Sequence, residues 1–247
     1  MATAFDSMLR GAEKMVAKVG QMVVDELPDA KVLKAYSELS IKVENVEDIV
    51  DAAQGFIVSG SKHFHPVPLL IRNERQGKLS VLHAEILPEV GIVVKHDCDS
   101  ELMRVTLPQQ SDNVLCKIQH PCGTTVYKAS TPDARGRIRV VGTSGSVDGV
   151  AILTLDSRRL WYLSVPKMIG VQFSTRSYRA TDSKRRRVGR IWPKLRSFSS
   201  DVMLVKLHDA ADDRHRVALL AIAIVQLLRT AHLEMYNLMK QSIAQCD

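Results

Sequence analysis

VALLAIAIVQLL occupies residues 217–228 and is the stretch of sequence that decides the fold. On a helix these residues are apolar on every side, and Gln226 is the only polar side chain among them. A membrane-spanning helix needs about 20 apolar residues, so this segment is too short to cross a bilayer. A helix that is apolar around its whole circumference belongs in a protein core. We therefore expect residues 217–228 to be enclosed by the rest of the chain.

The same segment belongs to a longer predicted helix over residues 212–245. Asp209, Asp212 and Asp213 cluster at its start, where acidic side chains cap free amides and favour the positive end of the helix dipole. Its second half is amphipathic, and one continuous helix of this length would extend roughly 50 Å. We expect the second half to project from the body, either across the N-terminal helices or into a partner.

Residues 55–207 have a different sequence pattern, in which short runs rich in β-branched residues are separated by Pro and Gly. About a dozen runs at this spacing are typical of an antiparallel sandwich or barrel. Strands and helices do not alternate, which excludes a parallel doubly wound fold. Three run–turn–run units each carry a Pro and a Gly in the turn, and Gly supplies a positive φ, so each predicts a β-hairpin. Their turns end at Gly91, Gly123 and Gly170.

The N-terminal region predicts helices. Apolar residues in 1–27 recur every three or four positions, which indicates an amphipathic helix, and further helices are expected over about 29–40 and 46–54. The apolar seam of the first helix could pack on the body, pair with another helix or lie on a membrane. The predicted architecture is α+β: an N-terminal helical extension, residues 1–54, followed by an antiparallel barrel-like β domain with a hydrophobic C-terminal helix, residues 55–247.

Composition limits the class of protein. The chain has 247 residues, of which 45% are hydrophobic and 25% charged, as expected for a globular protein. Its four cysteines match no zinc or haem spacing and are too few for a disulfide scaffold, which favours a reducing intracellular setting. A local disulfide between Cys116 and Cys122 is conceivable because the two flank a predicted turn. The N-terminus resembles neither a secretory signal nor a transit peptide.

No motif predicts an active site. The chain contains no GxSxG, no GxxxxGK[ST] and no GxGxxG after a strand. His63 with His65, and His96 with Asp97 and Asp99, are candidate metal ligands, but neither group has a third ligand at a fixed offset. We therefore expect no enzyme, no catalytic residue, no metal site and no cofactor.

A resemblance rests on two segments. VGRIW at residues 188–192, followed by an acidic turn and the apolar helix, and the hairpin NVLCKIQHPCGTTVYKA at residues 113–129, resemble the tubby-like superfamily. This superfamily includes tubby C-terminal domains, phospholipid scramblases and LURP-one-related proteins. The resemblance covers about residues 115–245 and implies a closed barrel around a central helix, with phospholipid binding. The chain lacks the family's Cys-rich acylation stretch and proline-rich tail, and Asp201 alone stands where the acidic calcium loop is found.

The basic character of the chain is confined to one segment. Residues 176–196 contain nine cations and one acid, a net charge of +8, so the other 226 residues together carry −1. Four of the cations are consecutive in TDSKRRR, a predicted turn at residues 181–187. Guanidinium groups suit phosphate because they can bind it with two parallel hydrogen bonds. The predicted anion-binding residues are Arg176, Arg179, Lys184, Arg185, Arg186, Arg187, Arg190 and Lys194.

These features favour an intracellular, non-enzymatic phospholipid-binding protein, specifically a phosphoinositide-binding or scramblase-like one. The expected partner is the surface of an anionic membrane, and the expected location is the cytoplasm, with membrane association or nuclear import as alternatives. One competing function is a structural subunit of an assembly, joined through the N-terminal helix and the end of the C-terminal helix. Another is a nucleic-acid-associated regulator, with residues 184–187 as an import signal. Finally, the basic turn could be a solvated hairpin tip or could pair with the acidic residues Glu44, Glu47, Asp48 and Asp51.

Overall fold

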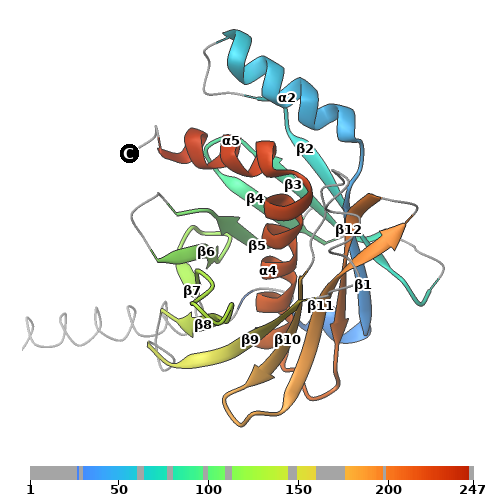
Figure 1. The fold of residues 1–247 in the computed structure, drawn as a ribbon, viewed down its shortest axis with the longest axis vertical. Coiled ribbons are helices and arrows are strands. Elements are labelled where there is room, and N and C mark those ends of the chain that lie inside the picture. Colours follow the sequence, from blue (N-terminus) through green and yellow to red (C-terminus); the bar gives the residue numbers. More distant parts are fainter. Residues whose placement is uncertain are drawn as a thin grey trace, which may run out of the picture.

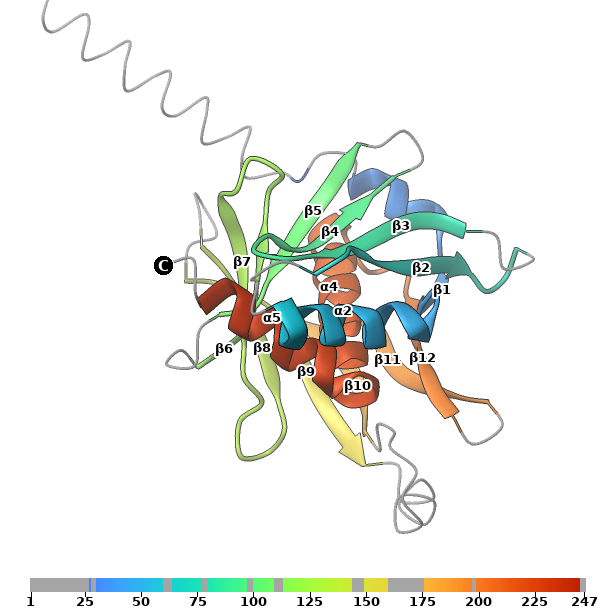
Figure 2. The same ribbon diagram turned by 90° about the horizontal axis from the view of Figure 1, so that it is seen from above.

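The computed structural model describes residues 27, 30–59, 64–76, 80–96, 100–108, 113–143, 149–159, 176–196 and 199–244. Twelve strands in these ranges form one closed antiparallel barrel, in which each strand pairs with its neighbours in the chain and β12 pairs with β1. Figure 1 shows helix α4 inside this barrel, and Figure 2 shows helices α2 and α5 across one of its ends. The predicted α+β barrel around a hydrophobic C-terminal helix is confirmed.

The elements have the following bounds. The strands are β1 Glu38–Val43, β2 Val67–Asn73, β3 Ser80–Leu87, β4 Gly91–Lys95, β5 Glu101–Thr106, β6 Val114–Gln119, β7 Thr125–Ser130, β8 Ile138–Gly142, β9 Ala151–Arg159, β10 Arg176–Asp182, β11 Arg187–Arg196 and β12 Ser199–Leu207. The helices are the 3₁₀-helix η1 Ala30–Ala35, α2 Val46–Ser59, α4 Asp213–Ala231 and α5 Leu233–Ala244.

Helix α4 is the centre of the hydrophobic core. Every side chain from residue 215 to residue 228 is buried, and the helix lies against β12, β11, β1, β6 and β9. Burying one large aliphatic side chain stabilises a fold by about 1.5–3 kcal/mol, so a helix that is apolar on all sides gains most when a barrel encloses it. The enclosure of residues 217–228 by the rest of the chain is therefore confirmed.

Glycine at position 189 lets β11 approach α4 closely. A Cβ atom there would lie 2.5 Å from Cδ1 of Leu219 on the helix and 2.6 Å from the carbonyl oxygen of Lys206 on β12. Both distances are shorter than a van der Waals contact, so the wall and the helix could not keep their present separation with a larger residue.

The start of α4 is fixed by Arg216. Its guanidinium is buried and donates hydrogen bonds to the carbonyl oxygens of Leu33 at 2.9 Å, Ala211 at 3.0 Å, Tyr36 at 3.0 Å and His208 at 3.2 Å. Without Arg216 these buried carbonyl oxygens would lose a hydrogen-bond donor, which would cost free energy of folding. Arg216 therefore joins α4 to η1 and to the end of β12.

The C-terminal segment does not form one continuous helix, so that part of the prediction is wrong, but its second half does lie against an N-terminal helix, α2, which was one of the two expected alternatives. The chain breaks at His232, and α5 leaves α4 at an angle of 113°. Helix α5 buries Met235, Leu238 and Met239 and contacts α2. A straight helix would expose this apolar face to solvent, whereas the bend places it over the end of the barrel (Figure 2).

The predicted helix over residues 29–40 is also wrong. Residues 30–35 form η1, and residues 38–43 form β1, which comes from the region assigned to the helical extension. In β1, Leu39, Ile41 and Val43 alternate with polar residues and are buried, as in a strand that covers a core on one face. The helix predicted over 46–54 is confirmed as α2, which continues through 57–59, where a strand was expected. Residues 1–26 lie outside the described residues.

Two of the three predicted hairpins are confirmed. Gly91 begins β4 with φ 101°, and Gly123 lies in the turn between β6 and β7 with φ 94°. These are left-handed conformations that glycine adopts without strain. The third hairpin, with Gly170, lies outside the described residues.

The two described cysteines do not form the conceivable disulfide. Cys116 and Cys122 are both free thiols. Cys116 is completely buried, and burial raises the pKa of its thiol to about 12, whereas Cys122 is exposed on the turn after β6. The two side chains therefore occupy opposite environments, which explains why no bridge joins them.

Within the described ranges, no single helix has both the length and the apolar character needed to span a bilayer. Only α4 and α5 taken together, across their bend, meet that requirement.

Candidate anion-binding surface

The basic turn between β10 and β11 is held by Asp182. Its carboxylate is almost completely buried and accepts hydrogen bonds from the backbone amide of Arg186 at 2.8 Å and from Nε of Arg186 at 2.7 Å. Burial raises the pKa of Asp182, but the hydrogen bonds from Arg186 outweigh it and hold the pKa below its usual value. The turn therefore has a defined shape, with Lys184 and Arg185 exposed at its tip.

A row of cations continues from this turn across the outer wall of the barrel. Arg179 on β10 pairs in register with Arg190 on β11, and Arg190 pairs with Lys206 on β12. Neighbouring strands lie about 4.8 Å apart, so the three side chains emerge side by side. Like charges directly opposite each other destabilise a sheet. Only Asp156, opposite Arg179 on β9, and Glu38, opposite Lys206 on β1, end the row with negative charge.

Two further arginines flank this row. Repulsion from Arg158, and then from Arg187 and Arg190, lowers the pKa of Arg179. In the part of the chain that the structure describes, these four guanidinium groups have no ion-pair partner; they are the groups of Arg158, Arg179, Arg187 and Arg190. We call the whole cationic surface the basic corner. It consists of Arg158, Arg179, Lys184, Arg185, Arg186, Arg187, Arg190 and Lys206.

Six of the eight predicted anion-binding residues lie in the basic corner, and two do not. Arg176 is at the other end of β10, at the first residue of the strand. Lys194 lies further along β11, opposite Val202 on β12, and forms an ion pair with Glu74. The structure therefore separates these two cations from the other six.

Arg158 and Lys206 belong to the basic corner although neither was predicted. Each is isolated in sequence from the 176–196 segment, and both join it through strand pairing: β9 with β10, and β12 with β11. The alternation of buried and exposed residues along a strand predicts that Arg158 and Lys206 point outward. Which cations they lie beside depends on the register between strands, which the number of charges in a segment does not reveal.

The aromatic side chain of Trp192 lies beside the basic corner. The guanidinium of Arg190 lies 5.2 Å from the centre of the Trp192 ring, a favourable cation–π contact. Trp192 is half-buried on the outer face of β11 and does not belong to the barrel core. Its ring supports Arg190 and holds the guanidinium at the surface.

The basic corner and the acidic segment lie at opposite ends of the barrel. Strand β1 begins at Glu38 and its other end leads into α2, so Glu38 lies at the end of the barrel away from α2. Glu38 pairs with Lys206, and Lys206 pairs with Arg190, so the row of cations lies at this same end. Figure 1 shows the turn between β10 and β11 at the lower end and α2 at the upper end. Glu47 and Asp51 on α2 therefore do not pair with the basic turn within one molecule.

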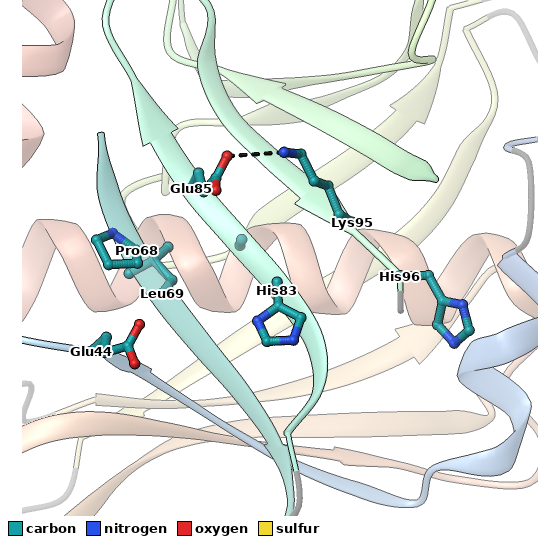
Figure 3. Close-up of a pocket in the computed structure, with 8 residues that line it drawn as sticks. Glu44, Pro68, Leu69, His83, Glu85, Lys95 and His96 are labelled. Carbon is teal, nitrogen blue, oxygen red and sulfur yellow. Dashed lines mark hydrogen bonds and ion pairs between the residues drawn. The ribbon is translucent and has the colours of Figure 1, made fainter. Parts of the chain in front are cut away.

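A shallow cavity of about 240 Å³ lies on the outer wall beside the start of α2. Figure 3 shows Glu44, directly after β1, facing strand β3 with His83, and an ion pair between Glu85 and Lys95 at 3.1 Å. His96 also lines it. In the described ranges, no three His, Cys, Asp or Glu side chains could hold one metal ion. Of the two candidate metal groups, His63, Asp97 and Asp99 lie outside these ranges.

No family model matches the chain, and neither curated proteins nor solved structures contain a match. Membership of the tubby-like superfamily is therefore part of the proposed function.

Proposed function

We propose that the chain is a non-enzymatic protein that binds anionic phospholipid surfaces through the basic corner, as a phosphoinositide-binding or scramblase-like member of the tubby-like superfamily. The observation that carries this proposal is the row Arg179–Arg190–Lys206, three cations opposite one another on adjacent strands. Arg190 has a cation on each side in this row, and a bound polyanion would remove the repulsion within these two like-charged pairs.

The chemistry of the basic corner suits phosphate groups. Arginine binds phosphate oxygens with two parallel hydrogen bonds, and most of the cations here are arginines. Each cation near an anionic leaflet contributes about 1 kcal/mol, so several acting together give reversible attachment. The proposed location is accordingly the cytoplasmic face of a membrane.

The polarity of the molecule supports the same function. The acidic side chains of α2 lie at the end opposite the basic corner. An anionic surface would attract one end and repel the other, so it would orient the barrel with α2 facing away.

Single-stranded nucleic acid presents the same phosphates but also needs aromatic rings on which its bases stack. Among the described residues of the basic corner and its strands, the aromatic ring beside the cations is Trp192, and Arg190 covers it. The surface therefore favours lipid headgroups over bases.

Flotation of the full chain with vesicles tests the proposal. We expect binding to phosphatidylcholine vesicles that contain phosphatidylserine or phosphatidylinositol bisphosphate, weakening as salt rises above about 0.15 M. Changing residues 184–187 to Ala, or making the double change Arg179→Ala and Arg190→Ala, should reduce binding at least about tenfold, because each cation contributes about 1 kcal/mol.

The matched control is the double change Lys117→Ala and Lys128→Ala. These two cations also lie opposite each other on adjacent strands, β6 and β7, outside the basic corner. The control should bind as the unchanged chain does. Equal loss in the control and in the basic-corner variants, or tighter binding to single-stranded RNA than to vesicles, would contradict the proposal.

A further inference from the structure

The outer face of α2 carries an unusual set of exposed apolar side chains. Val46 is 51% exposed, Val50 46% and Val58 86%, and Leu233 at the start of α5 is 49% exposed. These are four of the six large apolar residues that are most exposed in the described ranges. Figure 2 shows α2 as the outermost layer over this end of the barrel, so nothing in the described chain lies above it.

The fold does not account for these valines. Helix α2 attaches to the molecule through Ile49 and Ala52, which are buried, and through Phe56. Valine is a weaker helix former than most polar residues, because its branched side chain loses freedom on a helix. Stability alone would therefore place Lys, Gln or Glu at positions 46, 50 and 58.

Two of these valines are neighbours on the helix surface. Val46 and Val50 are four residues apart and form one short ridge, whereas Val58, eight residues beyond Val50, lies about 80° further round the helix. A short aliphatic ridge fits the groove between side-chain rows of a second helix. The pair Val46–Val50 therefore suits packing against a helix.

Negative charge lies on the same exposed face. Glu47 is three residues before Val50 and Asp51 is seven before Val58, so both acids lie on the same side of the helix as a valine, and both are exposed. Helix α2 contains no Lys or Arg. Among the described residues, neither Glu47, Asp51 nor Glu44 has an ion-pair partner. A partner that covers the valines must bring cations to these carboxylates, because unpaired buried charge is costly.

The cavity beside α2 extends the same surface. Glu44 lies two residues before Val46 and lines the cavity with His83 and Glu85. Its volume of about 240 Å³ would hold one long side chain. Glu85 is already paired with Lys95, so Glu44 is the carboxylate there that could attract a cation. A Lys or Arg could reach Glu44 while the aliphatic stem covers Pro68 and Leu69 (Figure 3).

We infer that the outer face of α2 binds a basic amphipathic helix of another protein, with aliphatic residues against Val46 and Val50 and with Lys or Arg against Glu47, Asp51 and Glu44. Because this face is at the end of the barrel opposite the basic corner, both surfaces could be occupied at once. The inference does not depend on lipid binding.

A synthetic peptide provides the probe. It has about 18 residues, long enough to form a helix, with Leu at positions three and four apart and Lys elsewhere. Fluorescence anisotropy of this peptide with the full chain should show saturable binding, and a peptide with Glu in place of Lys should not bind. The double change Val46→Thr and Val50→Thr should weaken binding about tenfold, a loss of about 1.4 kcal/mol. The double change Glu47→Lys and Asp51→Lys should abolish it.

Val150→Thr is the matched control, since Val150 is 51% exposed, as Val46 is, but lies between β8 and β9. This variant should bind the peptide normally. All the substitutions are at exposed positions, so circular dichroism should show unchanged folding. The inference is overturned if the peptide does not bind or if the valine and lysine variants bind like the control. It is also overturned if light scattering shows that α2 instead pairs two copies of the chain, through dimers that the threonine variants dissociate.

Discussion

Arg185 has φ 61°, in the left-handed region of backbone space, and is exposed at the tip of the turn between β10 and β11. A side chain with a Cβ is strained there by roughly 1 kcal/mol, whereas glycine is not. The chain therefore has an arginine at a position where glycine would be more stable, within the surface to which we assign phosphate binding. A strained residue is a reason to look for a function at that position.

The change Arg185→Gly separates stability from binding. Removing the Cβ should raise the free energy of unfolding by up to about 1 kcal/mol, because the strain disappears. The same change should weaken binding to anionic vesicles about fivefold, because one cation worth about 1 kcal/mol is lost. Urea unfolding and vesicle flotation measure the two effects. Lower stability of the glycine variant would show that the turn needs the arginine side chain for its structure.

Asp212 links the stability of α4 to pH. It caps the helix by accepting a hydrogen bond from the amide of His215 at 3.0 Å. Hydrogen bonding from His215 lowers the pKa of Asp212 to about 2. Because the folded pKa lies below the unfolded value of about 4, Asp212 contributes stability above pH 4 that is lost as the pH falls toward 2.

Two substitutions at this position give different expected results. Asp212→Asn keeps a capping side chain but cannot titrate, so the fall in stability between about pH 4 and pH 2 should become shallower. Asp212→Ala loses the cap and should lower the free energy of unfolding at neutral pH by about 1 kcal/mol. Thermal unfolding at several pH values measures both. An unchanged acid profile for the Asn variant would show that other carboxylates control acid unfolding.

At the scale of elements, a buried side-chain hydrogen bond joins β10 of the barrel wall to α4. The hydroxyl of Tyr178 on β10 donates to Oε1 of Gln226 at 3.3 Å, and both residues are almost completely buried. Nε2 of Gln226 has no hydrogen-bond partner in the described structure. Together with the hydrogen bonds of Arg216 and the contact of His215 Nε2 with the carbonyl oxygen of Ile152 at 3.0 Å, this contact fixes how α4 is rotated inside the barrel.

Removing one partner should cost more than removing both. Tyr178→Phe leaves the amide of Gln226 buried without its donor and should lower the free energy of unfolding by about 1–3 kcal/mol. Adding Gln226→Leu should restore most of that loss, because no unsatisfied polar group remains. Chemical denaturation of the single and double variants forms the test. If the two losses simply add, the hydroxyl and the amide do not interact.

The sequence predicts some of these elements and not others, for physical reasons. The apolar circumference of residues 217–228 is a local property, so the enclosed helix could be predicted. The break at His232 could not, because it depends on the apolar face of α5 finding cover near α2. The helix predicted over residues 29–40 overlaps the first three residues of β1, because the pairing of β1 with β12, far along the chain, determines its structure.

The candidate site divides in the same way. The turn at residues 184–187 was visible as a run of charge. Arg158 and Lys206 join it only through the registers of β9–β10 and β11–β12, and Lys194 is removed from it by Glu74, a residue of the distant β2–β3 turn. Long-range register and pairing of this kind require the closed barrel.

At the scale of the whole molecule, the barrel has two unlike ends. The basic corner occupies one end, and α2, with its valines and carboxylates, occupies the other. Both surfaces are built on the same closed barrel around α4. A protein of this kind could hold a partner on the side that faces away from a membrane.

Hydrogen–deuterium exchange of the full chain, with and without phosphatidylserine vesicles, tests this account most directly. We predict slower exchange on vesicle binding in the turn between β10 and β11 and in the first residues of β11, with no change in α2. Protection of α2, or an unchanged rate in the turn while the protein is bound to vesicles, would contradict the assignment of the basic corner as the membrane-binding surface.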